Sequence, residues 1–128
     1  MTAQELFNFT VSLMGLTSTN AQIEDEVYFG NLNMILSQTF NLENVNREYL
    51  ELDVLTAPQV VTDMADVLTY QENVLKRVVA FGVAQLFAMN DDDYNKSGFF
   101  EQRFADGMNR EDKMIVSDIV DYYGTEEE

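Results

Sequence analysis

Residues 91–104, DDDYNKSGFFEQRF, hold the clearest potential for chemistry, because oxygen-bearing side chains occupy alternate positions before a glycine. Aligning Gly98 with the glycine of an EF-hand calcium loop fills its first, third and fifth ligand positions. The residues at those positions are Asp93, Asn95 and Ser97. The twelfth position needs a bidentate glutamate but holds Phe104. We therefore expect no metal site. The same residues are explained by a turn between two helices, in which Asp93 or Ser97 caps the second helix.

Catalytic chemistry has few other candidates. The chain contains no cysteine and no histidine, which removes thiol nucleophiles, the commonest general base and the usual zinc ligands. Carboxylate pairs such as Asp63 with Asp66, or Glu24 with Glu26, are frequent in so acidic a sequence and are typical of caps and solvated faces. The sequence indicates a protein that is not an enzyme and needs no cofactor.

The charge limits the partners. There are 23 acidic and 7 basic residues, a formal net charge of −16, and the basic residues are dispersed. A surface of this sign repels nucleic acid and anionic lipid, so direct DNA binding is not expected, although DNA could slide past such a wall. No apolar run approaches the length of a membrane span and the N-terminus has no basic leader, so neither a span nor a signal peptide is predicted.

Hydrophobic periodicity predicts an all-α fold, a compact bundle of about four helices. The first begins at the possible capping box Thr2-Ala3-Gln4-Glu5 and stops near Gly15. The second follows caps in residues 17–20 and runs to about Thr39. Its apolar positions are Ile23, Val27, Met34 and Ile35.

The rest of the bundle follows an irregular connector over residues 41–58, in which NVNREYL is a possible short helix. A central buried helix is expected from about residue 70 to 89, where Gly82 indicates close approach of a neighbouring helix. A fourth helix from Lys96 or Ser97 toward Lys113 directs Phe100, Phe104 and Met108 inward. Residues 1–113 would form this helical domain, and residues 114–128 an extended C-terminal arm with an acidic tail, whose β-branched residues need a partner.

The order of these features resembles the head-to-tail connector, or adaptor, proteins of tailed bacteriophages. RVVAFGVAQLFAMNDDD followed at once by GFFEQRFADGMN matches their central helix, acidic turn and aromatic-x-x-Arg-aromatic helix. Further matches are NLNMILSQTFNLENVNRE, PQVVTDMADVLTY and IVDYYG. The resemblance extends from about Val27 to Gly124.

The resemblance implies a structural virion protein of the phage neck, at the head–tail junction, made in the bacterial host cytoplasm. Copies would form a ring of twelve, docked on the portal protein and bridging it to the stopper or another tail protein. Packaged DNA would pass through the ring without sequence-specific binding, and no membrane would be involved. The assembly interface would lie in the residues that match the family's inter-subunit or portal-facing parts. They are Phe99, Arg103, Met108, Met114, Ile115, Val116, Ile119, Val120, Tyr122 and Tyr123.

Alternatives remain open at this stage. Arg103 could form a local ion pair instead of an intersubunit contact. The chain could be a tail-completion or tail-terminator protein, or a monomeric acidic binding module, either calcium-dependent through the loop-like turn or mimicking the charge of DNA. A carboxylate-based enzyme is the last alternative.

Overall fold

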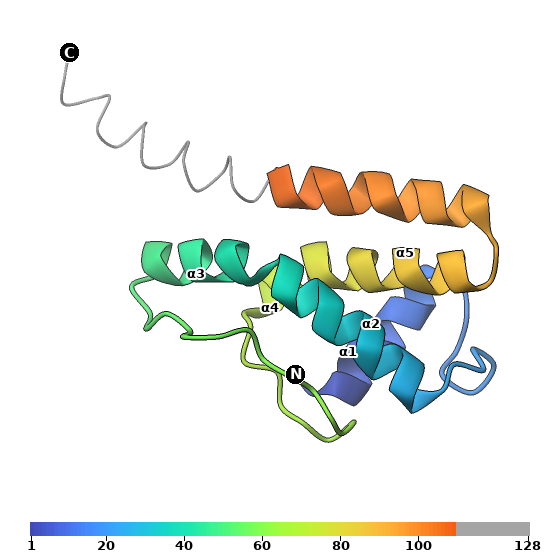
Figure 1. Ribbon diagram of the computed structural model, residues 1–128, viewed down its shortest axis with the longest axis horizontal. Helices are drawn as coiled ribbons and strands as arrows, with labels where there is room; N and C mark the ends of the chain where they lie inside the picture. Colours follow the sequence, from blue (N-terminus) through green and yellow to red (C-terminus); the bar gives the residue numbers. More distant parts are fainter. Residues whose placement is uncertain (110–128) are drawn as a thin grey trace, which may run out of the picture.

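The computed structural model describes residues 1–109, and within them every regular element is a helix, so the all-α prediction is confirmed. Figure 1 shows α5 and a helix of residues 94–109, here named the outer helix, lying side by side, with α1 on the opposite side of α5. The predicted arm, residues 114–128, lies outside the described residues. The elements before the outer helix are α1 (Ala3–Leu13), α2 (Asp25–Gln38), α3 (Phe40–Tyr49), α4 (Glu72–Val74), the π-helical turn η1 (Leu75–Val79) and α5 (Ala80–Asn90).

Local sequence sets both ends of α1, as predicted. The Thr2 hydroxyl accepts a hydrogen bond from the Glu5 backbone N–H, and the Glu5 carboxylate accepts one from the Thr2 N–H. Two of the unpaired donors at the helix start are thereby satisfied. Beyond the C-terminal end, Gly15 adopts a φ of 77°, a conformation that glycine takes without strain.

The predicted start of α2 is wrong. Residues 17–20 form a turn of their own, in which the Asn20 side chain accepts from the Thr17 N–H, and they cap no helix. The chain then turns through Gln22 at a φ of 53°, and α2 begins at Asp25. Its predicted apolar face is also partly wrong, because Ile35 is buried whereas Val27 and Met34 are exposed.

The segment expected to be an irregular connector begins with a ten-residue helix, α3, so the connector starts only after Tyr49. The sequence is polar, but Glu43 and Arg47 lie one turn apart and form an ion pair with 2.6 Å between Oε2 and Nε. The Glu43 side chain is fully buried. Such i, i+4 pairing together with the burial of Leu42 stabilises a helix that hydrophobic periodicity alone does not reveal.

The irregular residues 50–71 are held by side-chain amides that replace strand pairing. The Asn44 amide donates to the Leu55 carbonyl and accepts from the Leu55 N–H, and Asn33 binds Val61 in the same two-way manner. The N-terminus pairs with the later part, where Leu68 donates to the Met1 carbonyl. Backbone groups that have no helix to satisfy them are thus paired, and the connector is an ordered part of the fold.

The core lies where α1, α2 and α5 meet. The rings of Phe7 and Tyr28 are 5.0 Å apart, and Phe87 lies 6.3 Å from Phe7 and 6.1 Å from Tyr28. The Tyr28 hydroxyl donates to the Ala3 carbonyl at 2.7 Å, which satisfies the one polar atom of this buried ring. The aromatic cluster therefore joins the start of α1 to α2 and to the last turns of α5.

Glycines allow the outer helix to approach α5 and η1 closely. An added Cβ at Gly82 would lie 2.9 Å from Phe104 Cε2 and 3.0 Å from two side-chain carbons of Ile35. At Gly107 it would lie 2.9 Å from the Arg77 carbonyl oxygen. The close approach predicted from Gly82 is confirmed, and it involves two neighbouring helices at once.

Candidate assembly surface

One face of the outer helix packs against the core, so the opposite face points to solvent. Phe100 is buried with its ring 6.4 Å from that of Phe81. Phe104 and Met108 are partly buried against the core. Because residues 100, 104 and 107 follow a helical spacing, residues 99 and 103 occupy the solvent side. The expectation that Phe100, Phe104 and Met108 turn inward agrees with this packing.

An aromatic–cation pair stands on the solvent side of the outer helix. Phe99 is 54% exposed, and the guanidinium carbon of Arg103 lies 5.2 Å from the centre of its ring. Within residues 1–109, no carboxylate comes within ion-pair distance of Arg103, so the local ion pair is not formed there. The pair exposes a large apolar ring and a guanidinium that no carboxylate of residues 1–109 engages, and aromatic and arginine side chains are enriched in protein interfaces.

The predicted interface residues divide into three groups. Phe99 and Arg103 lie together and exposed, whereas Met108 is partly buried and contributes to the packing of the outer helix. The remaining ones lie outside the described residues. These are Met114, Ile115, Val116, Ile119, Val120, Tyr122 and Tyr123.

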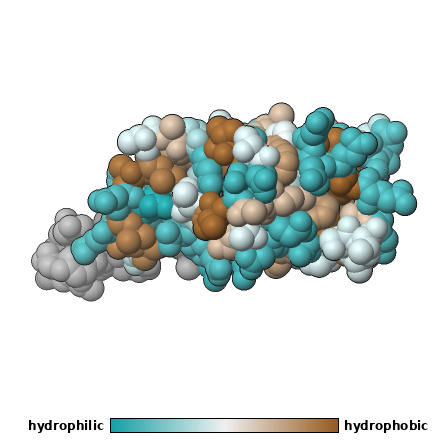
Figure 2. All heavy atoms as spheres, turned by 90° about the horizontal axis from the view of Figure 1, so that it is seen from below, coloured by the Kyte–Doolittle hydropathy of each residue, from teal (hydrophilic) through white to brown (hydrophobic). Residues whose placement is uncertain are grey.

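A second exposed apolar surface was not predicted from the sequence. It comprises Leu50, Leu52 and Val54, which follow the last turn of α3 and are each more than two-fifths exposed; Val60 and Val67, farther along the connector, are also exposed. Figure 2 shows hydrophobic atoms gathered toward one end of the molecule, the end at which Figure 1 places the last turn of α3. Exposed apolar patches often mark interaction sites. The sequence did not predict this one, because its residues follow neither helical nor strand spacing.

A buried charge network holds this connector against α3. The Glu43 carboxylate accepts from the Gln71 N–H at 2.9 Å and from Arg47. The Arg47 guanidinium also donates to the Asp53 carbonyl at 2.9 Å and to the Thr69 carbonyl. Burial raises the pKa of Glu43, while the Gln71 N–H and Arg47 act in the opposite direction. This network positions the chain and has no free group for chemistry.

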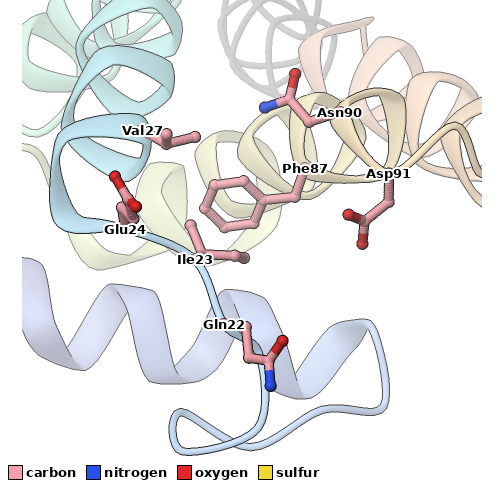
Figure 3. Close-up of a pocket in the computed structure, with 7 residues that line it drawn as sticks. All are labelled: Gln22, Ile23, Glu24, Val27, Phe87, Asn90 and Asp91. Atoms are coloured by element: carbon pink, nitrogen blue, oxygen red, sulfur yellow. The ribbon is translucent and has the colours of Figure 1, made fainter.

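A pocket of about 160 Å³ opens between the segment that leads into α2 and the end of α5. Figure 3 shows the Phe87 ring and Ile23 facing one another in its middle, with Glu24 and Asp91 on opposite sides. Val27, Asn90 and Gln22 complete the lining. The sequence did not indicate this pocket, because its two walls are more than sixty residues apart in the chain.

The calcium-loop residues are part of a helix start. The Asp93 carboxylate accepts from the Lys96 N–H at 3.1 Å, which makes Asp93 the cap of the outer helix, as the alternative interpretation predicted. Asn95 and Ser97 belong to that helix and not to a loop. Among residues 1–109 no group of three or more acidic side chains is arranged to hold a metal ion.

The paired aspartates of the connector also have structural partners. Asp66 Oδ2 accepts from the backbone N–H groups of Thr62 and Asp63, and Asp63 Oδ1 accepts from that of Ala65. These bonds close a tight turn. The two carboxylates thus serve as caps, the role that the sequence favoured over acid–base chemistry.

Comparison of the chain with family models, curated proteins and solved structures gave no match. In the part of the chain that the structure describes, no helix combines the length and apolar character needed to cross a membrane. The resemblance to phage connectors therefore rests on the quoted residues, and the surfaces described above are the structural basis for any function.

Proposed function

We propose that this protein is a structural component of the neck of a tailed bacteriophage, a connector whose copies form a ring between the portal and the tail. The resemblance of the central helix, acidic turn and outer helix supports the phage assignment. The ring's function is to hold its neighbours together around the DNA channel, with no chemical transformation of a substrate.

The observation that carries the assembly role is the Phe99–Arg103 pair. The helix that bears it is fixed against α5 by Phe100 and by the close contact at Gly82, and against η1 by the close contact at Gly107. A large ring and a guanidinium held outward on a rigid helix, with no carboxylate partner among residues 1–109, are suited to binding another protein surface.

The charge is compatible with a position beside DNA. With a net charge of −16, the inner wall of a ring would repel phosphates, and packaged DNA could move through without binding. The same charge also opposes association between copies at low salt, so contacts between them need local charge complementarity or apolar burial.

An imaging experiment tests this proposal. An antibody against the chain, applied to purified virions of the phage that encodes it, should label one position per particle, where the tail joins the head. Labelling at the distal tail or over the capsid, or absence of the chain from mature particles, would contradict the neck assignment.

A second experiment tests the arm. A chain truncated after Lys113 should keep its helical circular dichroism and melting temperature but fail to join its neighbours, because the removed residues act in assembly. Native mass spectrometry compares the oligomeric state of the full and truncated chains. A collapse of the fold on truncation would show that residues 114–128 belong to the subunit's own core.

A further inference from the structure

The pocket between α2 and α5 has the dimensions and chemistry of a receptor for a pair of side chains, not for a larger ligand. Its volume of about 160 Å³ is below the roughly 300–1,000 Å³ typical of sites for drug-sized ligands. Its centre is apolar, formed by Ile23, Val27 and Phe87, and the carboxylates of Glu24 and Asp91 flank that centre. An occupant that combines apolar surface with a positive charge is the best match.

The local field also favours a cation. The pocket lies at the C-terminal end of α5, the negative end of the helix dipole, and Asp91 is the C-cap residue of that helix. The opposite wall is the start of α2, whose positive end is offset by Asp25 and Glu26 in its first turn. Glu24 forms no side-chain cap of α2, so its carboxylate is not used by that helix.

Arg103 is a described cation whose position suits it to be that occupant. Arg47 pairs with Glu43, Lys76 lies 3.7 Å from Glu72, and Lys96 donates to the Met14 carbonyl. Arg103 instead lies over the Phe99 ring, with no carboxylate among residues 1–109 at ion-pair distance. A guanidinium stacked on a ring keeps its outer N–H groups available for carboxylates.

We propose that Phe99 and Arg103 of one copy bind the pocket of the next copy, with the ring against Ile23 and Val27 and the guanidinium between Glu24 and Asp91. This inference rests on the proposed function, because it supplies the contact between neighbouring subunits of the ring. It places opposite charges together in a chain whose net charge otherwise opposes self-association.

The two surfaces are unlike, which determines the kind of assembly. The pair stands on the solvent side of the outer helix, whereas the pocket is formed by α5 and the segment leading into α2. A contact between two different patches is heterologous, and repeated copies of it close into a ring or extend as a filament. A symmetric dimer would not result from this contact alone.

Two charge-reversed proteins test the contact. Arg103→Glu places a carboxylate against the acidic pocket, and Glu24→Lys combined with Asp91→Lys places ammonium groups against Arg103. Each protein alone should self-associate on the order of a hundredfold more weakly than the wild type, because like charges then meet across the interface. All three side chains are exposed, so melting temperatures should show that each variant folds.

Mixing the two reversed proteins should restore association. Every contact in an alternating assembly then joins opposite charges, either the introduced carboxylate with the lysine pocket or Arg103 with the native pocket. Sedimentation velocity measures the recovery. Glu48→Lys combined with Asp53→Lys makes the same change in net charge at exposed positions outside the pocket. This matched control keeps Arg103 and the pocket, so it should self-associate at least as strongly as the wild type.

Disulfide trapping gives an independent measure, because the chain has no cysteine of its own. A mixture of R103C and E24C proteins should form a crosslinked heterodimer under mild oxidation. R103C mixed with T62C, an exposed position outside the pocket, should crosslink at least about tenfold more slowly, because trapping rates follow the effective concentration of the two thiols.

Clear outcomes would overturn this inference. They are crosslinking at position 24 no faster than at position 62, a mixture of reversed proteins that stays monomeric, or a loss of self-association in the matched control as large as in the pocket variant. The same results would leave the neck assignment standing if the antibody labels the head–tail junction, since the ring would then use other contacts. Conversely, a confirmed contact in a protein missing from virions would retain the interface and remove the phage function.

Discussion

Replacing Gly82 by alanine should destabilise the protein, although alanine is the better helix former. The added Cβ would lie 2.9 Å from Phe104 Cε2, closer than real Cβ atoms pack, and 3.0 Å from Ile35 Cδ1 and Cγ2, closer than most of them pack. Ile35 is buried and lies on α2, so it has little freedom to move away. The substitution therefore pushes α2 and the outer helix away from α5 together.

The magnitude follows from two opposing effects. Inserting a methyl group into a close-packed core typically costs about 1–3 kcal/mol. Alanine in place of glycine within a helix returns about 1 kcal/mol. The net loss in the free energy of unfolding should be about 1 kcal/mol, with a fall in the melting temperature of a few degrees for a chain of this size.

Gly30→Ala is the matched control. Gly30 also lies inside a helix, α2, but an added Cβ there meets no atom within 4 Å. This variant should gain up to about 1 kcal/mol, because only the helix preference changes. Urea unfolding followed by circular dichroism, with an unchanged dependence on denaturant, gives both values. A Gly82→Ala protein as stable as Gly30→Ala would refute the close packing of the three helices.

Two further changes test the Glu43 network and the turn before the outer helix. Because burial raises the pKa of Glu43, its contribution to stability is fully present below the unfolded pKa of about 4.3 and is lost as the pH rises through the folded pKa. The unfolding free energy of the wild type minus that of Glu43→Gln should therefore fall as the pH rises from about 4 toward neutrality. Urea titrations at several pH values measure this difference. A difference that does not change with pH would contradict the raised pKa. Asp93→Ala should cost about 1 kcal/mol through loss of the helix cap, and thermal melts with and without calcium should coincide for this variant and for the wild type. A calcium-dependent rise of several degrees in the wild type alone would restore the calcium-loop interpretation.

The contact between Arg103 and the pocket and the burial of apolar connector or arm residues should respond differently to salt. Salt relieves the repulsion between copies with a net charge of −16 whichever surface they use, but it also screens the attraction of Arg103 for an acidic pocket. Association through the pocket should therefore strengthen less with salt than association through apolar residues. Burial of apolar connector or arm residues is not weakened by this screening, since the hydrophobic effect does not depend on charge. The salt dependence of wild-type association thus reports which of the two surfaces dominates between copies.

Short-range features could be predicted from the sequence because their causes lie within a few residues. The capping box at Thr2 and Glu5, the left-handed Gly15 and the Asp93 cap each depend on side chains and backbone groups of one turn. Gly82 indicated a close neighbour because a glycine inside a helix needs a compensating contact. The sequence did not identify which helices make that contact.

The α2 start and the connector were predicted less well, because competing local signals are decided by distant partners. Residues 17–20 have good capping chemistry but bind one another, and α2 starts five residues later. In the sequence, Asn33 and Asn44 look like ordinary polar residues of a helix. In the structure, their amides donate hydrogen bonds to the backbone carbonyls of Val61 and Leu55. Nothing local distinguishes an amide that pairs with a distant backbone from one that faces water.

The sequence by itself determined the all-α class, the acidic character, the lack of thiol and imidazole chemistry, and the outward position of Phe99 and Arg103 relative to Phe100. These follow from composition and from the helical period, which any folded arrangement of the chain must keep. Only the tertiary structure decided that Glu43 is buried with Arg47, that Arg103 lacks a carboxylate partner among the described residues, and that Ile23 and Phe87 form a pocket between two carboxylates. Those facts depend on distances between residues far apart in the chain, and such distances are set by packing.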